Sequence, residues 1–280
     1  MNPQRVDDAV ALPPFRVPAF WYGAAEPRAT LLLVPALGTA AGYYRPVATA
    51  LSARGIQVLV PEVPGTGESG PRPSRAADYG YGDLVERYLP ALAALARDRG
   101  GERPLVLAGH SLGAQVVALA VLHGHVAPAA VLSLAGGLIY YRYWDGAAAY
   151  GLLAMAAAVT ALTYACGYLP GRLVGFGGSQ ARTLMREWSQ AIRQGRYPGF
   201  AERDRVAVTV PALSVYFAGD GYAPRRSAAA LASALGGELR GLDNERPGNP
   251  HAGWARQPDT TVACVEEWLA GNGILQPAGA

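Results

Sequence analysis

The chain contains no lysine, because all 24 basic residues among its 280 residues are arginines. These arginines are scattered and nearly balanced by 21 acidic residues, so we expect no nucleic-acid partner. Only two cysteines are present, Cys166 and Cys264, and their apolar surroundings predict buried free thiols and no metal site. Residues 1–10 include Asp7 and Asp8 and lack the apolar core of a signal peptide, which predicts a cytoplasmic location.

Apolar residues, in contrast, make up 51% of the chain, which excludes a disordered or fibrous protein. Short apolar runs alternate with segments of helical spacing, a pattern typical of an α/β fold with a doubly wound, mostly parallel sheet and helices on both faces. Pro90 predicts a kink or break in its helix. The predicted strands are Phe15–Tyr22, Ala29–Val34, Ile56–Pro61, 104–108, 129–134, Ala212–Phe217 and Glu238–Leu242, and the predicted helices are 44–54, 81–99, 114–122, 225–235 and 260–269.

The alternation of strands and helices stops within residues 136–209. We therefore expect a core formed by 1–135 and 210–280, with 136–209 inserted as a helical cap or lid. This insertion contains Ala147–Cys166, which is almost wholly apolar and about as long as a membrane span. Three interpretations remain open: a buried cap helix over the catalytic face, a lid whose apolar surface contacts a lipid or membrane interface, and a transmembrane helix. Its many small residues weigh against the last.

The pentapeptide at 109–113 reads Gly-His-Ser-Leu-Gly and lies between a predicted strand and a predicted helix. This order of strand, G-x-S-x-G and helix predicts a nucleophile elbow, in which Ser111 occupies a strained turn with its hydroxyl exposed above the sheet. Glycines are needed on both sides because a side chain there would collide with the neighbouring strand or helix. The pentapeptide therefore indicates a nucleophilic serine.

A serine nucleophile needs an imidazole base, and the chain has four histidines. His110 lies inside the elbow and should point away from the active face. His123 and His125 lie at the end of the following helix, where a surface or capping role is expected. Only His251 follows the last predicted strand, which is where the base belongs if the chain order is serine, acid, histidine.

The acid that orients the base should follow the strand Ala212–Phe217, and Asp220 is the carboxylate at that place. Asp243 is the alternative, although it follows the next strand and fits a turn better. The oxyanion of acyl transfer needs two preorganised N–H donors. We expect the backbone amides of Leu112, directly after the nucleophile, and of Leu37, in the loop after an early strand, to supply them.

These residues resemble the α/β-hydrolase superfamily over essentially the whole chain. Many of its members carry His-Gly-x-Gly in the loop where this chain has Pro35 and Ala36 in place of the His-Gly pair. That difference removes a histidine that often braces the loop. The segments 35–38, 167–172 and 220–224 are also similar to a bacterial subgroup of predicted serine α/β-hydrolases, which implies the triad Ser-Asp-His without implying a substrate.

The cap usually determines specificity in this superfamily, and here its aromatic residues favour an apolar acyl chain or ring. Tyr140, Tyr141 and Trp144 leave the sheet near the active face, while Tyr222 and Trp254 flank the acid and the base. All five are candidate substrate-binding residues, although Tyr140, Tyr141 and Trp144 could equally serve to pack the cap on the core.

The resemblance implies a serine hydrolase that acts through an acyl-enzyme, and the apolar, aromatic cap favours an ester or thioester of a hydrophobic acid as its substrate. Two other functions stay open: an acyltransferase or cyclase of natural-product biosynthesis with the same triad, and a ligand-binding α/β-hydrolase fold without catalysis. We expect no cofactor and no metal, a hydrophobic small molecule or acyl group as substrate, and a weak lipid contact through the cap as a further alternative.

Overall fold

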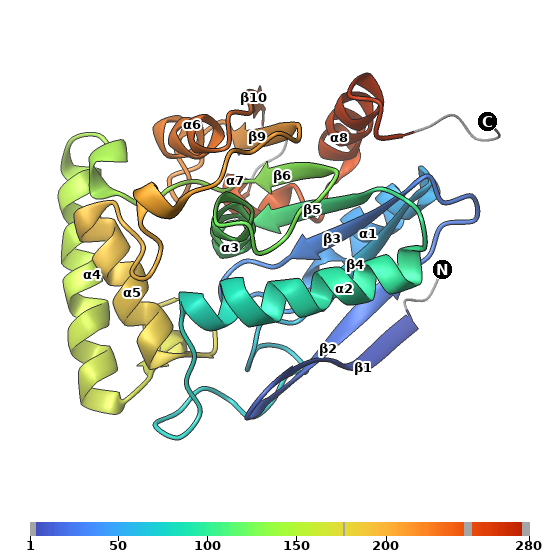
Figure 1. The fold of residues 1–280 in the computed structure, drawn as a ribbon. Helices are drawn as coiled ribbons and strands as arrows, with labels where there is room; N and C mark the ends of the chain where they lie inside the picture. The colour runs from blue at the N-terminus through green and yellow to red at the C-terminus, as the bar shows by residue number, and fades with distance from the viewer. Residues whose placement is uncertain (1–3, 176, 244–247, 276–280) are drawn as a thin grey trace.

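A computed structural model of the protein describes residues 4–175, 177–243 and 248–275 (Figure 1). Its centre is an eight-stranded sheet in the order β1-β2-β4-β3-β5-β6-β9-β10. β1 and β2 pair antiparallel, as do β2 and β4, and the other neighbours are parallel, so the predicted mostly parallel sheet is confirmed. The strands are β1 (Gln4–Leu12), β2 (Phe15–Tyr22), β3 (Ala29–Val34), β4 (Ile56–Pro61), β5 (Leu105–His110), β6 (Ala130–Leu134), β9 (Ala212–Phe217) and β10 (Glu238–Leu242).

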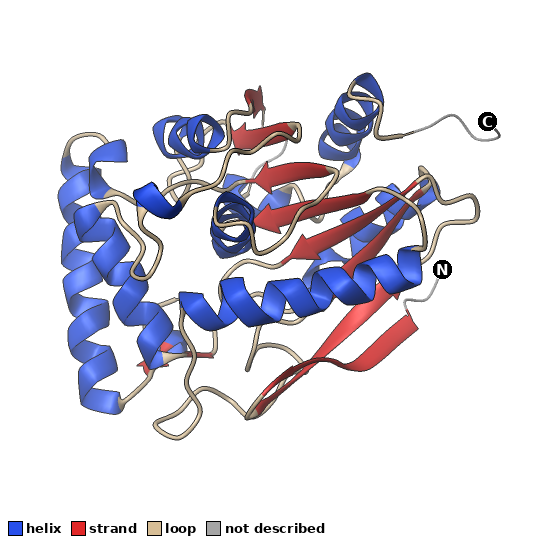
Figure 2. Ribbon diagram, viewed as in Figure 1, coloured by secondary structure: helices blue, strands red, loops and turns tan. Residues whose placement is uncertain are grey.

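Helices cover both faces of this sheet (Figure 2). On one face, α2 (Leu89–Gly100), α3 (Leu112–Leu122) and α6 (Arg225–Ala234) share one apolar cluster with the strands. On the other face, α1 (Arg45–Ala53) and α8 (Asp259–Gly271) form a second cluster. Strands buried on both faces need no polar alternation, which explains why β3, β4 and β5 read as short apolar runs.

Two polar residues inside the buried strands β3 and β4 are paired with each other. Thr30 and Gln57 lie at the amino ends of β3 and β4, where the Gln57 Nε2 donates to the Thr30 hydroxyl over 2.8 Å. Both side chains are buried, at 1% and 5% exposure. A buried polar group that keeps a partner avoids most of its desolvation cost, so this pair is tolerated in an apolar layer.

Two elements differ from the predictions. β1 was not predicted, because Asp7 and Asp8 interrupt the apolar alternation that would have indicated a strand. The break expected at Pro90 takes the form of a π-helix, η2 (Asp83–Tyr88), which runs directly into α2 and places Pro90 in its first turn. Proline is tolerated there because the first amides of a helix have no intrahelical acceptor.

Between β6 and β9 the chain leaves the sheet; we call residues 135–211 the β6–β9 connection. Its two long helices, α4 (Ala147–Cys166) and α5 (Arg182–Gln194), pack against each other. Figure 1 shows both beyond the carboxyl ends of β3, β5 and β6. The connection also contains the short elements η3 (Tyr141–Tyr143), β7 (Leu169–Pro170), η4 (Gly171–Leu173), β8 (Ser179–Gln180) and η5 (Glu202–Asp204), with β7 and β8 paired antiparallel.

α4 is largely exposed, so its interpretation as a buried cap helix is wrong. Only 22% of its most apolar window is buried, and Tyr150 and Tyr164 are 74% and 61% exposed.

The prediction of two buried thiols is wrong for one of them, because Cys166 at the end of α4 is partly exposed while Cys264 is buried. Among the described residues, α4 is the one helix long and apolar enough to cross a membrane, by length and composition alone.

Candidate active site

The predicted elbow is present at the carboxyl end of β5. Ser111 is the single residue between that strand and α3, and its backbone has φ 53° and ψ −111°. A positive φ is rare for a residue with a side chain and costs energy that the surrounding structure must supply. Ser111 is partly exposed, whereas its neighbours on both sides are buried.

The two glycines of the elbow are required by close packing. A Cβ on Gly109 would lie 2.3 Å from the carbonyl carbon of Gly113, and one on Gly113 would lie 2.1 Å from the carbonyl oxygen of Val34. Because Val34 ends β3, the second contact also places the start of α3 directly against the loop that begins at Pro35. The turn that exposes Ser111 and this loop are therefore packed as one unit.

Asp220 and His251 form an oriented acid–base pair. Asp220 follows β9 and is 5% exposed, and its Oδ2 lies 2.8 Å from His251 Nδ1. Its other oxygen, Oδ1, accepts hydrogen bonds from the amides of Tyr222 at 2.8 Å and Ala223 at 3.1 Å. A carboxylate held in this way keeps the Nδ1–H tautomer of the imidazole and leaves Nε2 as the atom that can receive a proton.

The base itself stands on the short helix α7 (Pro250–Gly253), whose amino end is capped by Asn249. The Asn249 Oδ1 accepts the His251 amide at 3.0 Å. Among the described residues, no hydrogen bond joins the Ser111 hydroxyl to the His251 imidazole. Contacts between a nucleophile and its base are often long without substrate and shorten on binding.

His110 makes buried contacts that the sequence did not indicate. It is 1% exposed, its Nδ1 lies 2.8 Å from the Tyr44 hydroxyl, and its Nε2 lies 2.9 Å from the His251 carbonyl oxygen. Burial, together with the neighbouring His251, holds the pKa of His110 well below its usual value. No local motif could have revealed these contacts, because the partners are 66 and 141 residues away.

The alternative acid, Asp243, is exposed and makes no hydrogen bond or ion pair with the described residues. His123 and His125 follow the end of α3 as expected, and the His123 ring contacts Phe200 at a centroid distance of 5.2 Å. Among the described residues, therefore, Asp220 is the carboxylate that contacts the candidate base.

The aromatic residues of the connection lie in two places. The rings of Tyr140 and Tyr141 pack edge to face at 5.1 Å, with the Arg142 guanidinium over both. Trp144 contacts the acid turn instead, because its Nε1 donates to the Gly221 carbonyl at 2.8 Å. Trp144 is thus the member of this group that touches the turn of Asp220.

The two aromatic residues that flank the acid and the base also differ. Tyr222 is 64% exposed, and its ring centre lies 5.2 Å from that of His251. Trp254 is 3% exposed, stacks on Phe217 at 6.0 Å and donates its Nε1 to the His251 carbonyl at 3.1 Å. Trp254 is therefore packed in the core, where it holds the backbone carbonyl of the candidate base.

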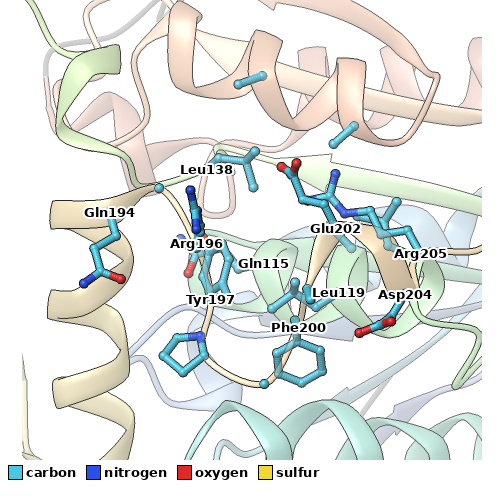
Figure 3. A pocket seen from close by; sticks show the side chains of 18 of the residues that line it. Gln115, Leu119, Leu138, Gln194, Arg196, Tyr197, Phe200, Glu202, Asp204 and Arg205 are labelled. Carbon is cyan, nitrogen blue, oxygen red and sulfur yellow. The ribbon is translucent and has the colours of Figure 1, made fainter.

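A cavity of about 850 Å³ opens between α3, the end of α5 and η5. Figure 3 shows Gln115, Leu138 and Tyr197 around it. None of Ser111, Asp220 and His251 lines this cavity, so we assign it no substrate. A second cavity, of about 480 Å³, lies beside the loop after β3 and is lined by Gly38, Ala40, Tyr168 and Arg172 among others.

That loop contains Leu37, one of the two expected oxyanion donors, and the other, Leu112, is the first residue of α3. Neither amide donates to another described residue. The first amides of a helix have no intrahelical acceptor, so the Leu112 N–H is available to a ligand. The fold, the strained serine and the acid–base pair together define an esterase-like serine hydrolase of the α/β-hydrolase fold.

Comparison with known families agrees with this class. The family described as "Serine aminopeptidase, S33" matches residues 25–165, about half of the chain, and the chain belongs to this family. The matched segment includes the loop after β3 and the elbow. A search of curated protein sequences finds no match to the chain.

Solved structures share the fold at low sequence identity. A soluble variant of monoglyceride lipase from Saccharomyces cerevisiae, bound to a substrate analog, has a TM-score of 0.71 at 11% identity, with 97% of this chain and 95% of that chain covered. A thermostable carboxyl esterase from Bacillus coagulans with glycerol has a TM-score of 0.70 at 14% identity, covering 97% and 99%. A thermophilic esterase from Thermogutta terrifontis has 0.63 at 16%, covering 98% and 100%.

Proposed function

We propose that the protein cleaves an ester or thioester of a hydrophobic acid through an acyl-enzyme on Ser111. The serine oxygen attacks the acyl carbonyl while His251 takes the hydroxyl proton on Nε2, and the same proton then passes to the leaving alcohol or thiol. Water repeats the sequence and releases the acid. Asp220 keeps the tautomer and stabilises the imidazolium, and the amides of Leu37 and Leu112 stabilise the oxyanion.

One observation carries this proposal. The carboxylate of Asp220 is buried, is held by two backbone amides, and points its remaining oxygen at His251 Nδ1 over 2.8 Å. A buried carboxylate is expensive unless its bonds are complete, and a binding module has no use for an oriented imidazole beside a strained serine. The ester bond as target is supported by the neighbouring folds, which are esterases and a lipase.

We propose further that residues 136–209 act as the cap of this site, with 1–135 and 210–280 as the core. The position of α4 and α5 beyond the carboxyl ends of the strands supports this division (Figure 1). The hydrogen bond from Trp144 to Gly221 supports it as well, because it joins the start of the cap to the acid turn. A cytoplasmic location stays a prediction, to be tested by cell fractionation.

The test uses a fluorophosphonate probe and p-nitrophenyl esters of increasing chain length. We expect labelling of the wild type at Ser111, steady turnover that improves with chain length, and loss of both in Ser111→Ala. A probe that leaves the folded wild type unlabelled would refute the triad. A burst that stalls, and that an added alcohol or amine restores, would favour acyl transfer or cyclisation over hydrolysis. Turnover of thioesters with the same acyl chains, compared with that of the esters, then shows which of the two bonds the protein cleaves faster.

We also propose that the outer face of α4 contacts an anionic lipid surface. α4 has no charged residue, and its exposed face consists of small residues between two tyrosines. The Arg186 guanidinium lies over the Tyr164 ring at 5.3 Å, and Leu173 nearby in sequence is 78% exposed. The exposed residues of this face are Ala147, Ala148, Tyr150, Gly151, Ala154, Ala157, Ala158, Ala161, Tyr164 and Ala165.

The charges of residues 136–209 favour an anionic surface. This segment holds eight arginines against four carboxylates, a net charge of +4, whereas the whole chain has +3. All four carboxylates have partners: Asp145, Glu202 and Asp204 form ion pairs, and Glu187 accepts the Tyr81 amide. Five arginines form no salt bridge with a described carboxylate, namely Arg142, Arg172, Arg186, Arg193 and Arg196. Each basic residue near an anionic lipid surface contributes about 1 kcal/mol to the free energy of binding.

A contact at the surface fits this structure better than a span. α5 packs along α4, and the Arg75 guanidinium ties the end of α4 to the core by donating to the carbonyls of Ala165 and Cys166. We expect the protein to sediment with vesicles of phosphatidylglycerol and not with vesicles of phosphatidylcholine. Arg186→Gln together with Tyr164→Ser should weaken this binding, whereas Arg54→Gln, at the far end of the sheet, should not. Equal binding to both vesicles, or to neither, contradicts the proposal.

A further inference from the structure

A buried chain of hydrogen bonds connects the loop after β3 with the loop of the candidate base. The Ala36 amide donates to the Tyr44 hydroxyl at 2.8 Å, and the same hydroxyl lies 2.8 Å from His110 Nδ1. On the far side of the ring, His110 Nε2 lies 2.9 Å from the carbonyl oxygen of His251. Tyr44 and His110 are 0% and 1% exposed, so water does not compete for these bonds.

The direction of every bond in this chain follows from its ends. The His251 carbonyl can only accept, so His110 Nε2 must carry the proton and Nδ1 of the neutral ring must accept. The Tyr44 hydroxyl therefore donates to Nδ1 and uses a lone pair for the Ala36 amide. Burial raises the pKa of Tyr44 and lowers that of His110, which keeps both groups neutral and this arrangement intact.

The chain of bonds joins two loops that come from distant strands. Ala36 follows β3, whereas His251 follows β10, and the strands β5, β6 and β9 lie between them in the sheet. Both loops meet at the elbow, because His110 is the residue directly before Ser111. A shift of either loop relative to the serine would break a buried hydrogen bond and leave its partner unsatisfied.

Near Leu37, the loop after β3 is closed by the Thr39 amide, which donates to the Ala36 carbonyl at 3.2 Å, and the Leu37 side chain packs against two apolar clusters. Pro35 has no amide hydrogen, and Ala36 stands where related loops carry a glycine that follows a bracing histidine. At the other end of the loop, the buried Glu62 carboxylate accepts the Ala41 amide at 2.9 Å. The Tyr44 hydroxyl accepts the Ala36 amide, directly before Leu37, and among these contacts it is the one that links the loop to His110 and the base loop.

We propose that Tyr44 and His110 are positioning residues for oxyanion stabilisation, which hold the Leu37 amide and the base loop in one fixed relation to Ser111. This inference rests on the proposed acyl-enzyme chemistry. Both residues act through the backbone of others and touch no reacting atom. We call the bonds from Ala36 through Tyr44 and His110 to His251 the tether. The tether takes the place of the bracing histidine that the Pro35-Ala36 loop lacks. It does not involve the hydrogen bond between Asp220 and His251.

The decisive variant is Tyr44→Phe, which removes one oxygen atom and keeps the ring. Since loss of an oxyanion donor costs about 10²–10³ in kcat, displacement of one should lower kcat about 10-fold or more, with KM changed less than about twofold. Affinity for a trifluoromethyl ketone, which forms the tetrahedral adduct on Ser111, should fall by the same factor as kcat/KM. Substrate affinity alone should not change.

Two variants of His110 test the direction of the chain. His110→Gln keeps one acceptor and one donor and should retain most of the activity, whereas His110→Leu removes both and should match Tyr44→Phe. Because both residues act in one chain, the losses in the double variant Tyr44→Phe/His110→Leu should not add.

Thr30→Val is the matched control for stability. Like Tyr44→Phe, this substitution removes a buried hydroxyl, here the one that accepts a hydrogen bond from Gln57. Thr30 lies at the amino end of β3, far from the loop of Leu37. Thr30→Val should therefore lower the unfolding temperature as Tyr44→Phe does and leave kcat unchanged. If Tyr44→Phe keeps the wild-type kcat in an enzyme that the probe labels, the tether is refuted while the proposed function stands. If the wild type is not labelled, the proposed function fails first. A rise in KM alone would also refute the positioning role.

Discussion

Asp220→Asn replaces one carboxylate oxygen with an amide nitrogen and leaves the shape of the side chain unchanged. The amides of Tyr222 and Ala223 both donate to Oδ1, so the asparagine must keep its oxygen there and turn its NH₂ toward His251. Two donors cannot face each other across the present 2.8 Å, so the imidazole must move its proton to Nε2. In that tautomer the ring cannot take the proton of Ser111.

The expected loss follows from this change of tautomer. Asparagine at the corresponding position of Ser-His-Asp proteases lowers kcat about 10⁴-fold, which corresponds to about 5 kcal/mol of transition-state stabilisation. KM should change little, because no contact with substrate is removed. Thermal unfolding should stay close to that of the wild type, since the two backbone amides keep their acceptor.

The assay is steady-state hydrolysis of a p-nitrophenyl ester, and Asp243→Asn is the matched control. Asp243 is exposed and has no partner among the described residues, so the same substitution there should leave kcat within about twofold. The reasoning is refuted if Asp220→Asn stays within about 10-fold of the wild type. It is also refuted if Asp243→Asn is the more damaging change.

Two further predictions concern the scaffold. Gly113→Ala places a Cβ 2.1 Å from the Val34 carbonyl oxygen, so it should lower the free energy of unfolding by about 3 kcal/mol or prevent folding. Gly151→Ala in α4 places a Cβ with no atom within 4 Å, so it should raise the free energy of unfolding by about 0.5–1 kcal/mol. Chemical denaturation measures both changes. Burial raises the pKa of Glu187, so the folded state favours its neutral form and loses stability as the pH rises above about 4.5. Glu187→Gln should reduce that loss in calorimetric melts. If the unfolding temperatures of the variant and the wild type change with pH in parallel, the prediction is contradicted.

The elbow could be predicted from local sequence because its physics is local. A serine at positive φ between a strand and a helix requires small residues on both sides, and Gly109 and Gly113 stand at those places. The order of Asp220 and His251 along the chain was informative for a similar reason, since parallel strands bring their following loops to one edge of the sheet.

Other features escaped prediction because they depend on contacts between distant segments. The burial of α4 is one example: its apolar sequence favoured a buried helix, yet α5 covers only one side of it. Trp254 is another, since an aromatic residue beside the base reads equally well as a pocket wall or as a support. Its burial and its stacking on Phe217 are visible only in the folded chain.

The sequence by itself determined the strands of the sheet from β2 onward, the turn that carries Ser111 and the choice of His251 as the candidate base. These follow from backbone sterics and from the chain order of one fold, which are readable along the chain. The tertiary structure decided the buried contacts of His110, the exposure of α4 and the packing of Trp254 beside the candidate base. Each of these depends on which groups are desolvated together, and desolvation is a property of packing between segments that the linear pattern does not record.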